Sequence, residues 1–311
     1  MQASLALLLP LALASAPADG GAAASQQAPG TSPERPIEFW RGIVASAYAV
    51  PEDESPSGLI RELSQHLGAR DPELRDELAY TISATWILRD GRLTGDEMLD
   101  LMDLWAANLD YAIGSVGDDT VLLRSFSALC LALLAARDNA EPFLEREGFE
   151  DLLQAALSYL EAERDLRGWE AEAGWFHSAA HTADLLKFLG RSQHLLPEEQ
   201  ADLLEGIAGR LIDTEGYAFA HGEDERFAAA AYAVISREDF DPAALDGALK
   251  RLTGARPGAR QAGGLDPIWF AGRQNAKAFL RVLYLGLALI EQPSTGEAKA
   301  AEATLDALKR M

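Results

Sequence analysis

Two of the five histidines in this chain lie one helical turn apart, and a carboxylate follows within the next turn. They are His177, His181 and Asp184, spaced i, i+4 and i+7. At about 100° per residue, the three side chains fall within roughly 60° on one face of a helix. Two imidazoles at this spacing can ligate one divalent metal such as zinc, and a nearby aspartate can ligate it too or orient a histidine.

Three roles fit this histidine-aspartate stripe. It can bind a metal, although the glutamate of the His-Glu-x-x-His motif is missing. It can act in acid-base chemistry or ligand binding without a metal. It can also be structural, with both histidines hydrogen-bonded to neighbouring helices. Apart from Lys187, the surrounding positions to Leu189 are apolar or small, which predicts an interior helix whose polar groups need partners.

A third histidine follows in the segment Tyr217–Arg226. His221 begins the second helical hairpin after the one that contains His177 and His181. From there it could face the same groove as these two histidines and complete a three-histidine metal site with them. The alternative is a loop histidine that precedes a helix.

Charged residues beside His221 supply the remaining candidates for catalysis. In the enzymatic alternative Asp184 orients or ligates, and Glu223 or Glu225 activates water. Arg226 would then clamp a substrate carboxylate. Glu223 and Arg226 are also spaced i, i+3, so they can simply pair on one helix.

The elements that must position these residues are helices. From Ile37 onward the apolar spacing is helical and no convincing strand pattern occurs, so the sequence predicts an all-α fold. About six helical hairpins favour an α/α superhelix or toroid of the HEAT kind, without a fixed sequence period. Thr94 and Glu97 form a capping box. The predicted helices are 37–49, 57–68, 72–89, 95–112, 119–136, 148–163, 174–190, 197–212, 223–236, 242–253, 267–291 and 296–310.

Several further side chains carry expectations about burial. Arg124 heads an apolar run and is expected to reach inward and neutralise Asp184 or Asp76. Cys130 is expected in the core. The segment Gly254–Gly264 is either a lid or a surface loop. Three tryptophans are also expected in the core, unless they line a cavity: Trp169, Trp175 and Trp269.

The N-terminus predicts export. An apolar run, Leu5–Leu13, precedes the small residues Ala14–Ala18, as in a secretory signal peptide over 1–18. A flexible tether over 19–36 and a single helical domain over 37–311 follow. The protein is therefore expected in the periplasm or outside the cell, and its one cysteine allows no internal disulfide.

Charge and missing motifs exclude several classes of partner. The formal net charge of −22 argues against nucleic acid and anionic membranes, and no segment is predicted to span a bilayer. No glycine-rich phosphate loop, nucleophile elbow or cysteine knuckle is present. A small molecule, a carbohydrate or a peptide remains as the expected partner.

One stretch resembles a known family. Gly174–Leu186, GWFHSAAHTADLL, is similar to the Gly-Trp-x-His-x-x-Ala-His-x-x-Asp-Leu-Leu segment of the bacterial domain of unknown function 2785 family. The resemblance implies a helical fold and a shared polar centre, and no established activity. Further similar pieces are Leu67-Gly68 with Asp71, Leu74–Asp76, Leu78–Tyr80, Arg124–Leu129, Glu223–Arg226 and Asn275–Tyr284.

The chain departs from that family pattern at one position. The pattern has an arginine before Gly-Trp, whereas here Ala173 stands there and Arg167 precedes an earlier Gly168-Trp169. Either a short insertion displaces the arginine or its role is lost.

The sequence thus predicts an exported helical-repeat protein with a His/Asp polar centre in its cleft. That centre would serve a metal-dependent hydrolase or a small-ligand site. The alternative is a protein-binding scaffold without catalysis.

Overall fold

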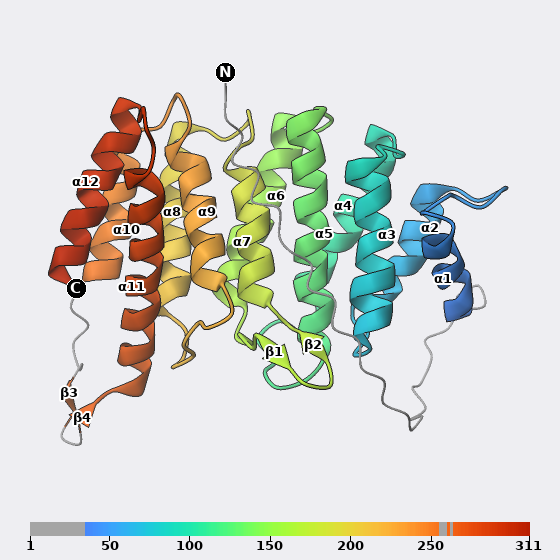
Figure 1. Cartoon of the computed structure of the whole chain (residues 1–311), viewed down its shortest axis with the longest axis horizontal. Helices are drawn as coiled ribbons and strands as arrows, with labels where there is room; N and C mark the ends of the chain where they lie inside the picture. The colour runs from blue at the N-terminus through green and yellow to red at the C-terminus, as the bar shows by residue number, and fades with distance from the viewer. Residues whose placement is uncertain (1–34, 255–259, 262–263) are drawn as a thin grey trace. The chain divides into compact units, whose positions relative to one another are not determined.

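The computed structural model describes residues 35–254, 260–261 and 264–311, and residues 37–311 form one compact unit. This unit is mostly helical, which confirms the all-α class (Figure 1). Strands in the described part are limited to two antiparallel pairs, β1 (Trp169–Glu170) with β2 (Gly174–Trp175), and β3 (Arg260–Gln261) with β4 (Gly264–Leu265). The predicted signal peptide, the tether as far as residue 34, and most of the segment 254–264, predicted as a lid or a surface loop, lie outside the described residues.

The helices follow the predicted ranges closely, because their apolar spacing and end signals are local. The capping box of Thr94 and Glu97 forms at the start of α4. One continuous helix, Glu73–Arg89, has π-type turns on both sides of its α-helical part α3 (Thr81–Ala84). The other helices are α1 (Ile37–Ala45), α2 (Pro56–Leu63), α4 (Gly95–Asn108), α5 (Thr120–Ala140), α6 (Arg146–Ala162), α7 (Ser178–Leu189), α8 (Pro197–Ile212), α9 (Glu223–Ile235), α10 (Ala243–Thr253), α11 (Pro267–Ala288) and α12 (Thr295–Arg310).

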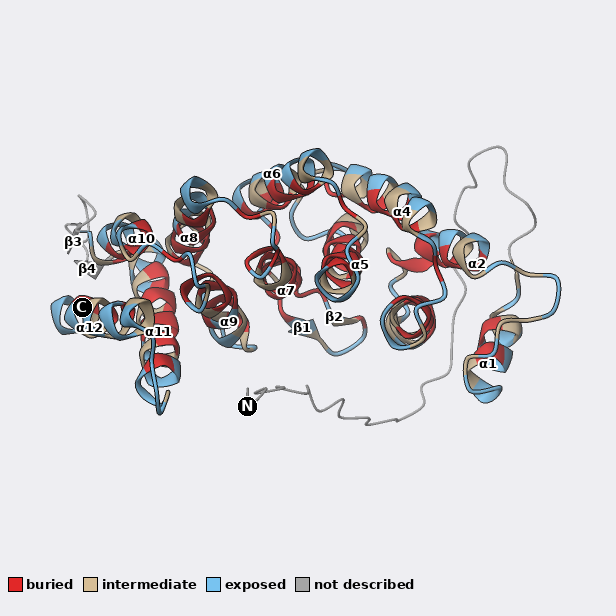
Figure 2. Cartoon of the chain, turned by 90° about the horizontal axis from the view of Figure 1, so that it is seen from above, coloured by how far each residue is buried: buried red, intermediate tan, exposed pale blue. Residues whose placement is uncertain are grey.

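Successive helices alternate between two rows within this unit (Figure 2). One row contains α5, α7 and α9, and the other contains α4, α6, α8 and α10. Helix α7 packs against α5 on one side and α9 on the other, with α6 behind it. This central place explains why the sequence of α7 is apolar almost all round, and it puts the candidate site between three helices.

Helix α5 is the core helix beside the site. Among the described helices, it alone is long and apolar enough to cross a membrane, and 72% of its most apolar window is buried inside this fold. A largely buried helix of this kind is typical of a protein core. Cys130 lies on it and is fully buried, as predicted.

Candidate functional site

The predicted stripe is not a single helical face, because α7 begins at Ser178 rather than at residue 174. His177 immediately precedes the helix in a left-handed conformation, with φ of 46°. Such a conformation is strained for a non-glycine residue and is often found at functional sites. Upstream, Gly174 and Trp175 form strand β2 instead of a first helical turn.

Three rings, those of Trp175, His181 and His221, lie around His177. The ring of Trp175 stacks on it, with centroids 4.2 Å apart and planes 23° apart. His181 meets it edge to face at 5.7 Å, and His221 lies 6.3 Å away. His221 also packs edge to face against Trp175, at 5.7 Å. The fold therefore brings all three predicted histidines together with an aromatic neighbour.

Ser125 on α5 determines which nitrogen of His181 carries the proton. Its hydroxyl contacts the carbonyl oxygen of Phe176 and lies 2.9 Å from Nδ1 of His181. The carbonyl can only accept, so the hydroxyl donates to it and accepts a hydrogen bond from Nδ1–H. Nε2 of the neutral His181 ring consequently keeps a free lone pair.

Burial keeps the imidazoles of His177 and His181 neutral. It lowers the pKa of His177 to about 3, and the positive charge of Arg226 lowers it further in the same direction. Burial also brings the pKa of His181 well below its ordinary value, with His177 and Arg226 acting the same way. Nε2 of His177 is buried and has no hydrogen-bond partner in the described part of the chain. A buried nitrogen of this kind calls for an explanation.

Asp184 is held between two cations. Its carboxylate accepts a hydrogen bond from Nη1 of Arg226 at 2.6 Å and another from Nζ of Lys187 at 3.0 Å. Tyr80 lies close enough for the negative charge of Asp184 to raise its pKa, an effect secondary to burial. Arg226 therefore clamps a carboxylate, as one expectation had it, but the carboxylate belongs to the protein itself.

The donors of the predicted zinc centre do not converge. In the described residues no group of three or more His, Cys, Asp or Glu side chains is placed to hold a metal ion. Nδ1 of His221 lies 3.9 Å from a carboxylate oxygen of Glu223, and Asp184 is engaged by Arg226 and Lys187. The geometry of the described residues therefore gives no support to a metal site of His177, His181 and His221, which stays a prediction.

Glu223 positions the loop rather than pairing with Arg226 along α9. Its side chain is buried, and one carboxylate oxygen accepts the backbone N–H of His221 at 2.7 Å. The His221 ring rests directly on Gly168, where an added Cβ would lie 2.1 Å from Nδ1. Any larger residue at position 168 would displace this ring, so Gly168 shapes the site.

The β1–β2 hairpin accounts for the departure from the family pattern. It pairs Trp169 with Trp175, and the N–H of His177 bonds to the carbonyl oxygen of Arg167 at 3.1 Å. The guanidinium of Arg167 lies 4.0 Å above the ring of Phe176. An arginine that precedes the Gly-Trp segment by a few residues thus lies beside it, which favours an insertion over a lost role.

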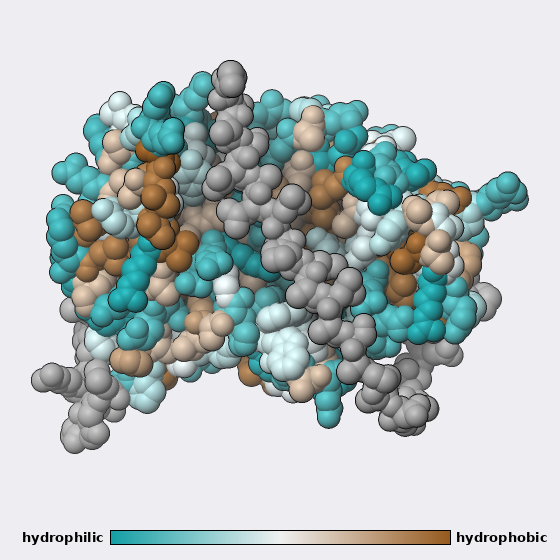
Figure 3. All heavy atoms as spheres, viewed as in Figure 1, coloured by the Kyte–Doolittle hydropathy of each residue, from teal (hydrophilic) through white to brown (hydrophobic). Residues whose placement is uncertain are grey.

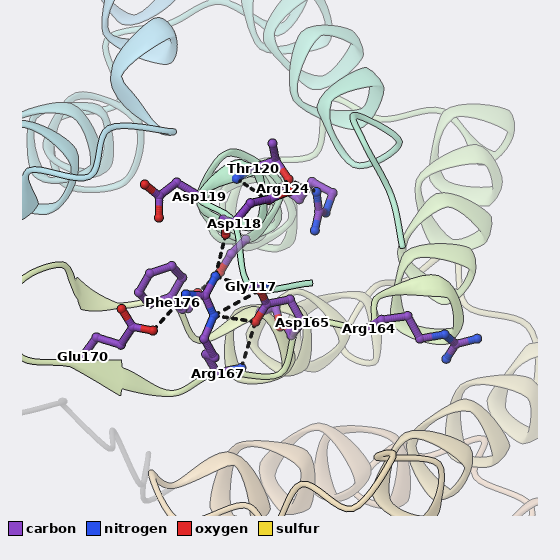
Figure 4. A network of polar contacts seen from close by, with 12 residues as sticks. Gly117, Asp118, Asp119, Thr120, Arg124, Arg164, Asp165, Arg167, Glu170 and Phe176 are labelled. Carbon is purple, nitrogen blue, oxygen red and sulfur yellow. Dashed lines mark hydrogen bonds and ion pairs between the residues drawn. The ribbon is translucent and has the colours of Figure 1, made fainter. Parts of the chain in front are cut away.

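Arg167 joins the hairpin to the rest of the fold (Figure 4). Its guanidinium binds the carboxylates of Asp165 and Glu170 and the carbonyl oxygen of Asp118. From the other side the fully buried Arg75, on the helix Glu73–Arg89, donates to the carbonyl oxygen of Ala173 at 2.8 Å. Two arginines therefore fix both ends of the hairpin.

The structure corrects the predicted burial of two tryptophans and the predicted partner of Arg124. Trp169 and Trp175 are 51% and 39% exposed, because the hairpin projects them from the helices, while Trp269 is half-buried. Arg124 is fully buried as expected, but it forms an ion pair with Glu163 at 2.7 Å rather than with Asp184 or Asp76.

Sequence reasoning missed Ser125, Phe126 and Arg75 as members of the site. The ring of Phe126 meets that of His181 edge to face, with centroids 4.9 Å apart. The guanidinium carbon of Arg75 lies 4.7 Å from the centre of the same Phe126 ring. The local signal was the pair of serines, Ser125 and Ser127, in a largely apolar helix, which does not indicate what either serine faces.

A known protein family matches the part of the chain that contains the histidine centre. Residues 109–285 match the family described as protein of unknown function (DUF2785), and this range covers more than half of the chain. The chain belongs to this family. The DUF2785 match extends from the residues before α5 to near the end of α11, so it includes every histidine of the centre. No curated protein and no solved structure matches the chain.

Proposed function

We propose that the centre around His177 binds a small polar organic ligand of the carbohydrate class, through the protein's own side chains. The observation that carries the proposal is the junction of two exposed tryptophans, Trp169 and Trp175, with buried and neutral imidazoles. The exposed rings are accessible from solvent, and His221, with a side chain 33% exposed, lies beside them.

A sugar fits the chemistry of these groups. Its C–H faces pack on aromatic rings, while its hydroxyls both donate and accept hydrogen bonds. A neutral imidazole also offers one donor and one acceptor, and Nε2 of His177 has no protein partner. Asp184 and Arg226 neutralise each other, so the centre presents little net charge that would select an ion.

A protein-binding scaffold is the second candidate. Its support is the exposed apolar residues at both ends of α11; hydrophobic residues are visible on this face of the molecule (Figure 3). Ile268 and Phe270 lie near the start of the helix, Leu285 near its end, and Leu289 directly after it. In this alternative the histidine centre is purely structural, and substitutions there would lower stability without affecting a small ligand.

Titration of tryptophan fluorescence with a panel of mono- and oligosaccharides tests the proposal. We expect saturable binding by the parent, weakened on the order of 10-fold by Trp175→Ala and by His177→Asn, since each removes one stacking or hydrogen-bonding partner. Asparagine tolerates the left-handed backbone at this position. Because Nε2 of His177 has no protein partner, His177→Asn leaves no partner of that nitrogen unsatisfied, and the melting temperature should fall only by the packing lost with the ring stacked on Trp175.

Two controls make the titration decisive. His194→Gln alters a partly buried histidine that bonds to the carbonyl oxygen of Leu144, away from the centre, and should not affect binding. Treatment of the protein with a chelator should also leave binding unchanged. The scaffold would be favoured if no sugar bound saturably. It would also be favoured if His177→Asn lost much stability but no affinity.

We further propose that the two rows of helices continue as an α/α superhelix of the HEAT kind, and that the protein is exported to the periplasm or beyond. Export is supported by the apolar run Leu5–Leu13 and the small residues that follow. N-terminal sequencing of the mature protein should then begin between about Pro17 and Ser25. Recovery of protein that retains Met1 would contradict export with cleavage.

A further inference from the structure

A pocket lined by none of the residues of the histidine centre opens where α8 and α10 end and α11 begins. Its volume is about 250 Å³. Close approach of two helices shapes one wall, since a Cβ added at Gly272 would lie 2.6 Å from the carbonyl oxygen of Ile212. The residues around it are Ile212, Asp213, Lys250, Arg251, Leu252, Gly254, Trp269, Gly272 and Arg273.

Positive charge predominates in this pocket. Lys250, Arg251 and Arg273 face a single carboxylate, Asp213, which pairs with Arg251 at 3.0 Å. Among the described residues, neither Lys250 nor Arg273 forms an ion pair; the Arg273 guanidinium lies 5.4 Å from the ring centre of Trp269. Three cations around one small cavity repel one another, which is unusual in a chain of net charge −22. A bound anion would relieve that repulsion.

The neighbouring pocket shows that the positive charge is specific to this place. That second pocket, of about 400 Å³, lies between α6, α8 and α10 and shares Arg251 and Asp213 with the first. It contains two further arginines, Arg164 and Arg210, but also three more carboxylates, those of Glu161, Asp202 and Glu205. The two cavities therefore share a wall and have opposite balances of charge.

We propose that the pocket of Lys250, Arg251 and Arg273 binds a small organic oxyanion with at least two negative charges, either a carboxylate or a phosphate ester. The guanidinium forks of the arginines suit the paired oxygens of both groups, and Lys250 adds a point charge. Trp269 and Leu252 provide apolar walls for the carbon skeleton. This site is independent of the proposed carbohydrate site.

Calorimetric titration with citrate and, separately, with inorganic phosphate tests the proposal. Both are added to the full-length mature protein in chloride buffer at constant ionic strength. We expect one saturable site for at least one of them. Arg273→Gln and Lys250→Gln should each weaken binding by about 10-fold or more, because a charge-assisted hydrogen bond is lost. Preference for citrate would identify a carboxylate ligand, and preference for phosphate a phosphorylated one.

Arg164→Gln is the matched control, because it removes an arginine of the neighbouring pocket. It should leave the affinity unchanged. Equal weakening by Arg164→Gln would mean that the anion responds only to diffuse charge, and would overturn the proposal. Failure of both anions to saturate at millimolar concentration would overturn it too. Lys250 is exposed, so Lys250→Gln remains informative even if Arg273→Gln does not fold.

Discussion

Glu163→Leu is expected to lower the free energy of unfolding by about 3–5 kcal/mol, because it leaves the fully buried guanidinium of Arg124 without a counter-charge. The two side chains form a bidentate pair, with Nε to Oε2 at 2.7 Å and Nη2 to Oε1 at 3.1 Å. Glu163 also accepts the backbone N–H of Asp165 at 2.9 Å, so its loss loosens the segment before the hairpin. Urea denaturation at pH 7.5 measures the change.

A double-mutant cycle separates a lost ion pair from lost packing. Arg124→Met with Glu163→Leu removes both charges together, so the double variant should recover much of the stability that Glu163→Leu loses. Additive losses from the two single substitutions would contradict a coupled pair. Arg61→Met removes an exposed arginine whose partner Asp100 lies 3.6 Å away, and it should change stability by less than about 1 kcal/mol.

Acidification from pH 7.5 to pH 5.5 is expected to lower the free energy of unfolding by about 3 kcal/mol through His177 and His181. Both have a folded-state pKa far below the ordinary value of 6.5, chiefly because of burial. Below pH 6.5 the unfolded chain therefore takes up two protons that the folded chain does not bind. This stability is fully present above pH 6.5 and is lost progressively as the pH falls toward the folded-state value, about 3 for His177.

Denaturation curves at several pH values, compared between variants, isolate this effect. His177→Asn should remove about half of the dependence on pH between 7.5 and 5.5. In NMR titrations the ring protons of His177 and His181 should not shift between pH 8 and pH 5. An ordinary titration near pH 6.5 for either ring would show that the centre is open to water and would contradict its burial.

Local patterns predicted most of the helices. The range 197–212 is α8 (Pro197–Ile212), and the Thr94–Glu97 capping box forms, because apolar spacing and end signals act over a few residues. The interior place of α7 was also predictable, since a helix without a polar face must be covered on all sides. The same reasoning indicated that the histidines and Asp184 would need partners.

The identity of those partners depended on contacts between distant segments. Arg226 reaches Asp184 from α9, 42 residues away in sequence, and Arg124 pairs with Glu163, 39 residues away. Periodicity indicates which face of a helix is buried, but it contains no information about which element covers that face. Asp184 and Asp76 were therefore both plausible partners for Arg124, and the partner is Glu163.

The predicted start of α7 at residue 174 was wrong for a related reason, since the helix begins at Ser178. Residues 174–177 fit a helical pattern, yet Gly174 and Trp175 pair with the strand of Trp169, and Arg75 binds the adjacent carbonyl of Ala173. Backbone hydrogen bonds to a hairpin and to a distant arginine outweigh the weak local preference for one more helical turn. Local sequence thus predicted the helices and the need for polar partners, whereas packing decided that the rings of Trp175, His181 and His221 surround His177.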